Sequence, residues 1–148
     1  MKSVKRLLTA ITLMAGVSMW FACAKDGGDN NDGANHNVGN DCLVCHRAGG
    51  GGDGIFSAGG TVYKAGTNTG ATGATVKLFV AADGSGSPAA TMTSEVGGNF
   101  YTKSSINFGS GLYIKVTSAT GASSMMNPVT SGACNGCHGV STGKITVQ

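Results

Sequence analysis

Two identical five-residue motifs contain the residues of this chain that are best suited to chemistry. They are residues 42–46 (CLVCH) and residues 134–138 (CNGCH), and both follow the pattern C-x-x-C-H, the attachment signature of c-type haem. In a helical turn, positions i, i+3 and i+4 share one face. Two thiols can therefore reach the vinyl groups of one porphyrin while the histidine ligates its iron.

The motifs predict two covalently bound haem c groups. The predicted thioether residues are Cys42, Cys45, Cys134 and Cys137. The predicted proximal iron ligands are His46 and His138.

Three other uses of paired cysteines compete with haem: a four-cysteine zinc site, disulfides in an exported protein, and a thioredoxin-type redox pair. None of them requires a histidine directly after each pair. The chain has only 3 histidines in 148 residues, so a histidine after both pairs by chance has odds on the order of one in two thousand. The pattern favours haem over zinc and over disulfides.

The sixth ligand of each iron is less closely defined by the sequence. Two bis-histidine haems need four histidines, and the chain has three. His36 is the spare one, and we predict that it is the distal ligand of one haem, in its own chain or in a neighbouring molecule. Ligation between molecules would join them head to tail into a filament.

For the other haem, Met126 or Met125 is a candidate axial ligand. The favoured alternative for both methionines is simple packing in the core, where Met fills irregular gaps. An open position that binds a small molecule is the remaining arrangement.

The chain begins with the features of an export signal. Three basic residues in the first six precede an apolar run of 18 residues (7–24), and no basic stop-transfer cluster follows. That run is at the lower limit for a spanning helix, so a signal is favoured over an anchor. Residues 20–23 (WFAC) resemble a bacterial lipobox, which implies a signal peptide over residues 1–22 and lipidation of Cys23. Cleavage after Ala24 is the alternative.

Removal of the signal changes the charge of the chain. The full sequence has 10 basic and 7 acidic residues, a formal charge of +3. Because three of the basic residues lie in the signal, the mature chain carries seven of each and is formally neutral. It therefore lacks the electrostatic footprint of a nucleic-acid-binding protein. We expect the periplasm, the outer-membrane surface or the extracellular space, with membrane contact only through a lipid anchor.

The mature chain divides into a tether and one domain. Residues 23–40 are rich in Gly, Asn and Asp, which predicts a flexible tether that contains His36. Residues 41–148 form the predicted dihaem domain. The glycine run at 49–52 lacks the Lys-Ser/Thr of a phosphate-binding loop, and we interpret it as a flexible loop or as backbone that lies close to a porphyrin.

Alternation of apolar and polar residues predicts strands in this domain. The residues predicted to face inward are Val76, Leu78, Val80, Leu112, Ile114 and Val116. Further strands are predicted over residues 60–64, 89–94, 99–104 and 144–148. With turn residues between them and no long helical period, the pattern predicts a mainly β fold, an antiparallel β-sandwich with little helix.

Parts of the chain resemble two known kinds of protein. Residues 60–62 (GTV), 73–78 (GATVKL) and 97–101 (GGNFY) resemble carboxypeptidase-regulatory, or prealbumin-like, β-sandwich modules. That resemblance covers residues 54–118 and implies a seven-stranded sandwich of Greek-key, prealbumin- or Ig-like type. The motif pair resembles the small multihaem c-type cytochromes of bacterial extracellular electron transfer.

The second resemblance implies a carrier of single electrons between envelope donors and extracellular acceptors. Its partners would be redox proteins or an external mineral or electrode, with a homopolymer as a further arrangement. The alternative is a haem enzyme or sensor with one open axial position, which needs nearby acid–base groups such as Glu95. A haem-free zinc or disulfide-stapled adhesion module is more remote. We favour an electron-transfer protein that is not an enzyme.

Overall fold

The computed structural model describes residues 36–148. The predicted signal peptide, the lipidation site Cys23 and tether residues 24–35 lie outside the described residues. In the part that is described, no helix has the length and apolar character needed to cross a membrane.

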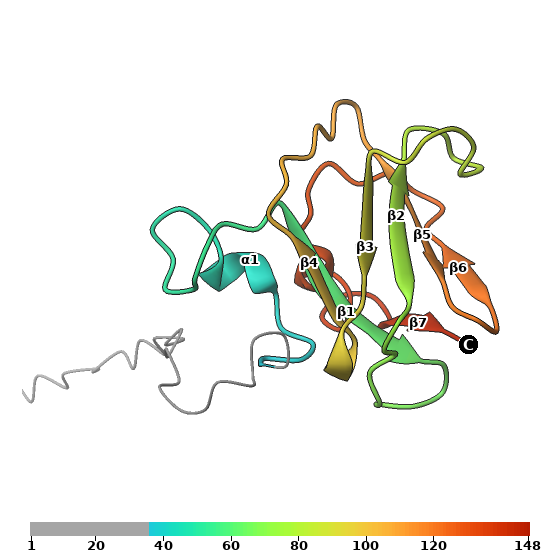
Figure 1. Ribbon diagram of the computed structural model, residues 1–148, viewed down its shortest axis with the longest axis horizontal. Coiled ribbons are helices and arrows are strands. Elements are labelled where there is room, and N and C mark those ends of the chain that lie inside the picture. The colour runs from blue at the N-terminus through green and yellow to red at the C-terminus, as the bar shows by residue number, and fades with distance from the viewer. Residues whose placement is uncertain (1–35) are drawn as a thin grey trace, which may run out of the picture.

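Seven strands and three short helical turns make up the described chain (Figure 1). The strands are β1 (Ala58–Lys64), β2 (Thr75–Phe79), β3 (Ala90–Thr93), β4 (Asn99–Thr102), β5 (Tyr113–Thr117), β6 (Ala122–Ser124) and β7 (Ile145–Val147). The helical turns are α1 (Cys42–Cys45) and the 3₁₀ turns η1 (Val96–Gly98) and η2 (Cys134–Gly136). The prediction of a mainly β sandwich with little helix is confirmed.

The strands form a three-stranded sheet of order β4-β1-β7 and a four-stranded sheet of order β3-β2-β5-β6. Every neighbouring pair is antiparallel except β1 and β7, which are parallel. The parallel pair departs from a purely antiparallel sandwich, because the last strand enters beside β1 in the direction in which β1 runs.

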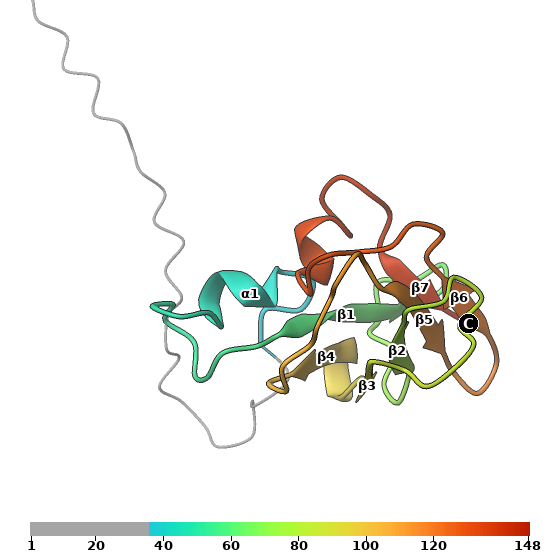
Figure 2. The same cartoon turned by 90° about the horizontal axis from the view of Figure 1, so that it is seen from above.

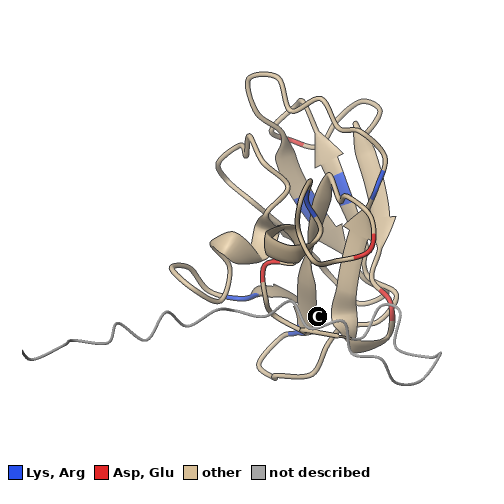
Figure 3. Ribbon diagram, turned by 90° about the vertical axis from the view of Figure 1, so that its left-hand side faces the viewer, with Lys and Arg blue, Asp and Glu red and all other residues tan. Residues whose placement is uncertain are grey.

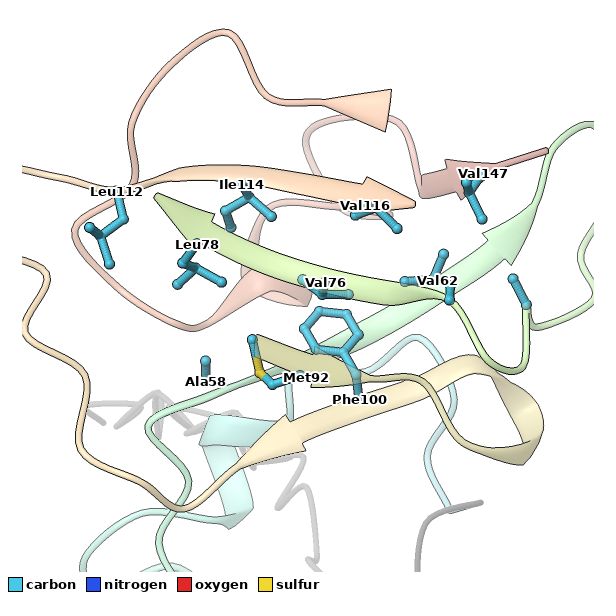
Figure 4. Close-up of a cluster of buried hydrophobic side chains, with 12 residues drawn as sticks. Ala58, Val62, Val76, Leu78, Met92, Phe100, Leu112, Ile114, Val116 and Val147 are labelled. Carbon is cyan, nitrogen blue, oxygen red and sulfur yellow. The ribbon is translucent and has the colours of Figure 1, made fainter. Parts of the chain in front are cut away.

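The core lies between the two sheets and consists of their inward side chains (Figure 4). The alternation predicted for β5 is confirmed: Ile114 and Val116 are buried and the residues between them are half-buried. The prediction for Val80 is wrong. Val80 is 74% exposed because β2 ends at Phe79, and Phe79 is buried where it lies against Gly84 of the following turn.

Strand β1 has a different kind of burial from the other strands. Six of its seven residues are buried in succession, so both of its faces are covered. The sandwich core covers one face. Figure 2 shows that α1 and the loop that carries η2 both lie beside the same end of β1. This strand therefore positions both C-x-x-C-H motifs.

Candidate functional site

The two motifs, far apart in the sequence, lie against neighbouring residues of β1. A Cβ atom on Gly59 would lie 3.1 Å from Cβ and 3.2 Å from Sγ of Cys42. A Cβ atom on Gly60 would lie 2.8 Å from Cβ of Cys134. The two consecutive glycines thus allow the first cysteine of each motif to approach the strand closely, since a side chain at either position would push a motif away.

Each motif forms a single helical turn, as the spacing predicted. In the first motif, the Asp41 carboxylate accepts a hydrogen bond from the Leu43 amide (3.0 Å) and caps α1. The amide of His46 donates to the carbonyl of Cys42 (2.9 Å), and that of His138 donates to Cys134 (3.0 Å). The same i to i+4 bond therefore places the histidine relative to the first cysteine in both motifs.

Both motif histidines have the same ring nitrogen held by a backbone carbonyl. Nδ1 of His46 lies 3.1 Å from the carbonyl oxygen of Asp53, and Nδ1 of His138 lies 2.6 Å from that of Gly143. Because a carbonyl only accepts, Nδ1 carries the proton and donates it. Nε2 of the neutral ring then keeps its lone pair, which is the arrangement of a metal-ligating histidine with an orienting partner.

His36 lies opposite His46 of the same chain. Their Nε2 atoms are 3.5 Å apart, and their ring centroids are 5.7 Å apart. Metal–imidazole bonds of about 2 Å would place two nitrogens on opposite sides of one ion about 4 Å apart. The two Nε2 atoms could therefore bind opposite sides of one metal ion if the two rings separated by about half an ångström.

The cleft between these two histidines is small. It encloses about 50 Å³ and is lined by residues that include His36, Cys42, Cys45, His46, Phe56 and Tyr101. A porphyrin needs far more space than this. Haem binding would therefore require other side chains that line the cleft to move aside, while the ligand types and the direction of the two imidazoles already suit it.

An aromatic stack fixes the ring of His46 from the other side. The rings of His46 and Phe56 are stacked with centroids 3.9 Å apart and planes 2° from parallel. Phe56 stacks in turn on Tyr101 of β4, with centroids 4.4 Å apart. His46 is buried, with 7% of its surface exposed. Its imidazole is thus held by a carbonyl, an aromatic face and burial together.

The glycine run at 49–52 packs against the first motif. A Cβ atom on Gly52 would lie 2.7–2.9 Å from atoms of the His46 ring. The Gly52 amide donates to the Cys45 carbonyl (3.0 Å). The run therefore folds back over its own motif, and the absence of a side chain at Gly52 leaves room for the imidazole.

The first cysteine of each motif lies in an environment that disfavours the thiolate. Burial, followed by the charge of Asp41, raises the pKa of Cys42. Burial, followed by the charges of Cys42 and Asp41, raises the pKa of Cys134 to about 12. Cys42, Cys134 and Cys137 are free thiols. Within residues 36–148, no three His, Cys, Asp or Glu side chains converge as a metal site.

The candidate methionines have contrasting environments. Met125 packs against the core, as the favoured alternative expected. Met126 is 88% exposed. Because its side chain projects into solvent, the favoured alternative of core packing is wrong for Met126, and axial ligation by this residue stays a prediction.

Charged residues of the described domain are few and of both signs. Figure 3 shows Lys and Arg scattered over the domain among Asp and Glu. The predicted absence of a nucleic-acid partner stays a prediction.

A group of buried polar residues beside the site was not predicted from the sequence. Thr61 of β1 lies opposite Asn99 of β4 in the strand register, and Asn135 belongs to the second motif. All three are buried. The sequence shows only that Thr61 and Asn99 are polar residues in two predicted strands. This is a weak signal for a buried polar group, because the strand register alone brings the two residues together.

Comparison of the chain with known protein families, with curated proteins and with solved structures found no match.

Proposed function

We propose that this protein is a dihaem c-type cytochrome that carries single electrons, and that it is not an enzyme. The observation that supports this most directly is the pair of Nε2 atoms of His36 and His46, which face each other 3.5 Å apart beside a C-x-x-C-H turn. When bound, each haem supplies one-electron redox chemistry at its iron.

The residues of the chain bind and orient. The cysteines at 42, 45, 134 and 137 hold the two groups covalently. The carbonyls of Asp53 and Gly143 keep the proton of each motif histidine on Nδ1, which leaves Nε2 for the iron. The Phe56 ring limits rotation of His46.

The position of the motifs favours a carrier over two independent sites. Gly59 contacts the first motif and Gly60 the second, so the two attachment points lie side by side on one strand. Single-electron exchange between two centres requires proximity, and the placement of the first cysteine of each motif against β1 supports such proximity within one molecule.

The axial ligands also favour a carrier. His36 and His46 would occupy both axial positions of the first iron, which leaves no open position there. The chain has 3 histidines, so His138 has no fourth histidine of its own chain as a partner. A sensor or enzyme role would therefore reside at the second motif. Binding of an external ligand to the second haem would favour that role, and its absence would favour the carrier.

The placement of His36 bears on assembly. Because His36 faces the His46 of its own chain, the proposal favours ligation within one molecule over a filament joined through this residue. The proposed partners are a redox donor in the envelope and an acceptor outside it, a protein, a mineral or an electrode. The proposed location is the periplasm, the outer-membrane surface or the extracellular space.

Intact mass of the exported protein tests the proposal. The full chain is produced in a bacterium that attaches c-type haem, and we expect two haem additions. The double variant Cys42→Ser/Cys45→Ser loses one haem, and Cys134→Ser/Cys137→Ser loses the other. As a matched control, Cys23→Ser keeps both. A wild-type protein without haem overturns the proposal.

A further inference from the structure

We infer that Thr61, Asn99 and Asn135 form a positioning unit that holds His36 over His46 and links this pair to the second motif. The inference rests on the proposed function, because it concerns the distal ligand of the first haem. The three residues touch neither iron nor porphyrin in this role, and they act through the backbone of residues 36–39.

Two of these residues hold the His36 segment on β1. The side-chain amide of Asn99 donates to the carbonyl of His36 (3.1 Å). The hydroxyl of Thr61 donates to Oδ1 of Asn99 (2.6 Å) and accepts from the Gly39 amide (2.9 Å). Both ends of the segment are thus tied to the same hydroxyl, directly or through Asn99.

The third residue connects the segment to the second motif. Oδ1 of Asn135 accepts from the Thr61 amide (2.7 Å), where it takes the place of a neighbouring strand's carbonyl. Nδ2 of Asn135 donates to the carbonyl of Gly39 (3.1 Å) and to that of His138 (3.4 Å). One carboxamide therefore contacts β1, the His36 segment and the second motif.

Burial makes these bonds decisive for the position of His36. Thr61 is fully buried, and Asn99 and Asn135 are buried. No buried side-chain nitrogen or oxygen in the described chain lacks a partner. If the Thr61 hydroxyl is removed, the Gly39 amide loses the partner with which it bonds here, and an unpaired group in this half-buried place is costly. His36 is exposed, so the segment can avoid this cost by moving into water.

Release of the segment would lower the fraction of molecules in which His36 is placed to ligate. The apparent affinity of an external ligand for the first haem rises as that fraction falls, since the two compete for one position. We therefore expect Thr61→Val, which keeps the shape of the side chain and removes the hydroxyl, to raise imidazole affinity at the first haem about tenfold or more.

The experiment uses the full dihaem protein and counts imidazole-binding events in spectroscopic titrations. His36→Ala defines the spectrum of first-haem binding. Thr61→Val is expected to show the same event, and Thr61→Ser, which keeps the hydroxyl, to titrate like the wild type. Val76→Ala, a core change away from the unit, serves as the control for stability: it lowers the melting temperature and leaves the titration unchanged.

A second readout needs no haem. In haem-free protein, amide hydrogen exchange at Gly39 is expected to accelerate in Thr61→Val and not in Thr61→Ser. If Thr61→Val does not fold, Asn99→Asp takes its place, because a carboxylate of the same shape cannot donate to the His36 carbonyl.

The outcomes separate the inference from the proposed function. A protein without covalent haem overturns the proposed function. A second outcome is haem-loaded protein in which His36→Ala gains imidazole binding at the first haem, but Thr61→Val (or Asn99→Asp) gains none. This outcome overturns the positioning role alone. Lack of any effect of His36→Ala overturns both the ligand role of His36 and this inference.

Discussion

The two C-x-x-C-H motifs are identical in pattern and differ in what surrounds them. The first motif buries its histidine: His46 is 7% exposed, stacks on Phe56 and faces His36. In the second motif, the half-buried Cys134 packs against the core and His138 is only half-buried. The attachment pattern alone therefore does not determine the axial environment, which depends on the neighbours that the fold supplies.

The difference arises from how each motif meets β1. The first motif contacts β1 at Gly59, and the glycine-rich loop after it folds over the imidazole. The second motif runs along the edge of β1, where the Gly59 amide donates to the Gly132 carbonyl (3.0 Å). It extends the sheet, so its first cysteine packs against the sandwich core and its histidine is left half-buried.

The largest expected effect concerns the Cys134 thiol of the second motif, which packs against the core. In haem-free, reduced protein at pH 8, we expect alkylation of Cys134 to be about a thousandfold slower in the folded than in the urea-unfolded state. The reason is that folding raises its pKa from 9.0 to about 12. Mass mapping of the alkylated peptides measures this rate, with the exposed Cys137 as the internal control. Equal rates for Cys134 in both states contradict the prediction.

The same pKa shift gives the sign of a stability change with pH. The folded state retains the Cys134 proton at pH values where the unfolded chain has lost it. Its contribution to the free energy of unfolding is therefore complete below about pH 9 and is lost as pH rises toward about 12. Chemical unfolding of the haem-free protein between these values measures the loss.

The next effect concerns the affinity of each haem for an external ligand. We expect imidazole to bind the second haem at least about tenfold more tightly than the first, about 1.4 kcal/mol, because His36 competes only at the first. Titration of the two double-cysteine variants, each with one haem, measures the two affinities. Equal affinities would remove the contrast between the motifs. Met126→Leu sharpens it: tighter binding in this variant would show that Met126 ligates the second iron.

A glycine near each histidine tests how tightly each motif is packed. A Cβ on Gly52 would lie 2.7–2.9 Å from the His46 ring, while one on Gly143 would have no atom within 4 Å. We expect Gly52→Ala to lower the free energy of unfolding by about 1–3 kcal/mol and Gly143→Ala to change it by less than about 0.5 kcal/mol. Urea unfolding measures both, and equal losses would show that the two loops are packed alike.

The smallest expected effect concerns the aromatic stack on His46 of the first motif. Phe56→Leu removes the ring that stacks on His46 and on Tyr101, and we expect a loss of about 1 kcal/mol of stability. Phe56→Tyr keeps the ring and serves as the matched control. Thermal unfolding measures the melting temperatures of both variants, and equal melting temperatures would contradict the prediction.

Local pattern was enough to predict most of the fold. The alternation around Leu78 and Ile114 predicted β2 and β5, because a sheet with one buried face imposes period two on the chain. It failed at Val80, where the strand has already ended, and it missed β6 (Ala122–Ser124), whose residues are all exposed and small. Edge strands without an apolar face carry no such signal.

The candidate site divides in the same way. The spacing of Cys42, Cys45 and His46 is a local property, and it predicted the helical turn that the motif forms. The hydrogen bonds of Thr61 with Asn99 and of Asn135 with Gly39 join residues far apart in the chain. No periodicity within a segment encodes such contacts, because they depend on the register between strands.

The sequence by itself determined the candidate chemistry and the class of fold, since both rest on the type and spacing of residues within short segments. Only the tertiary structure decided that His36 faces His46 in its own chain, that both motifs contact adjacent glycines of β1, and that the first motif buries its histidine while the second leaves its histidine half-buried. These features follow from the pairing of β1 with β4 and with residues 132–135, which is set by long-range packing.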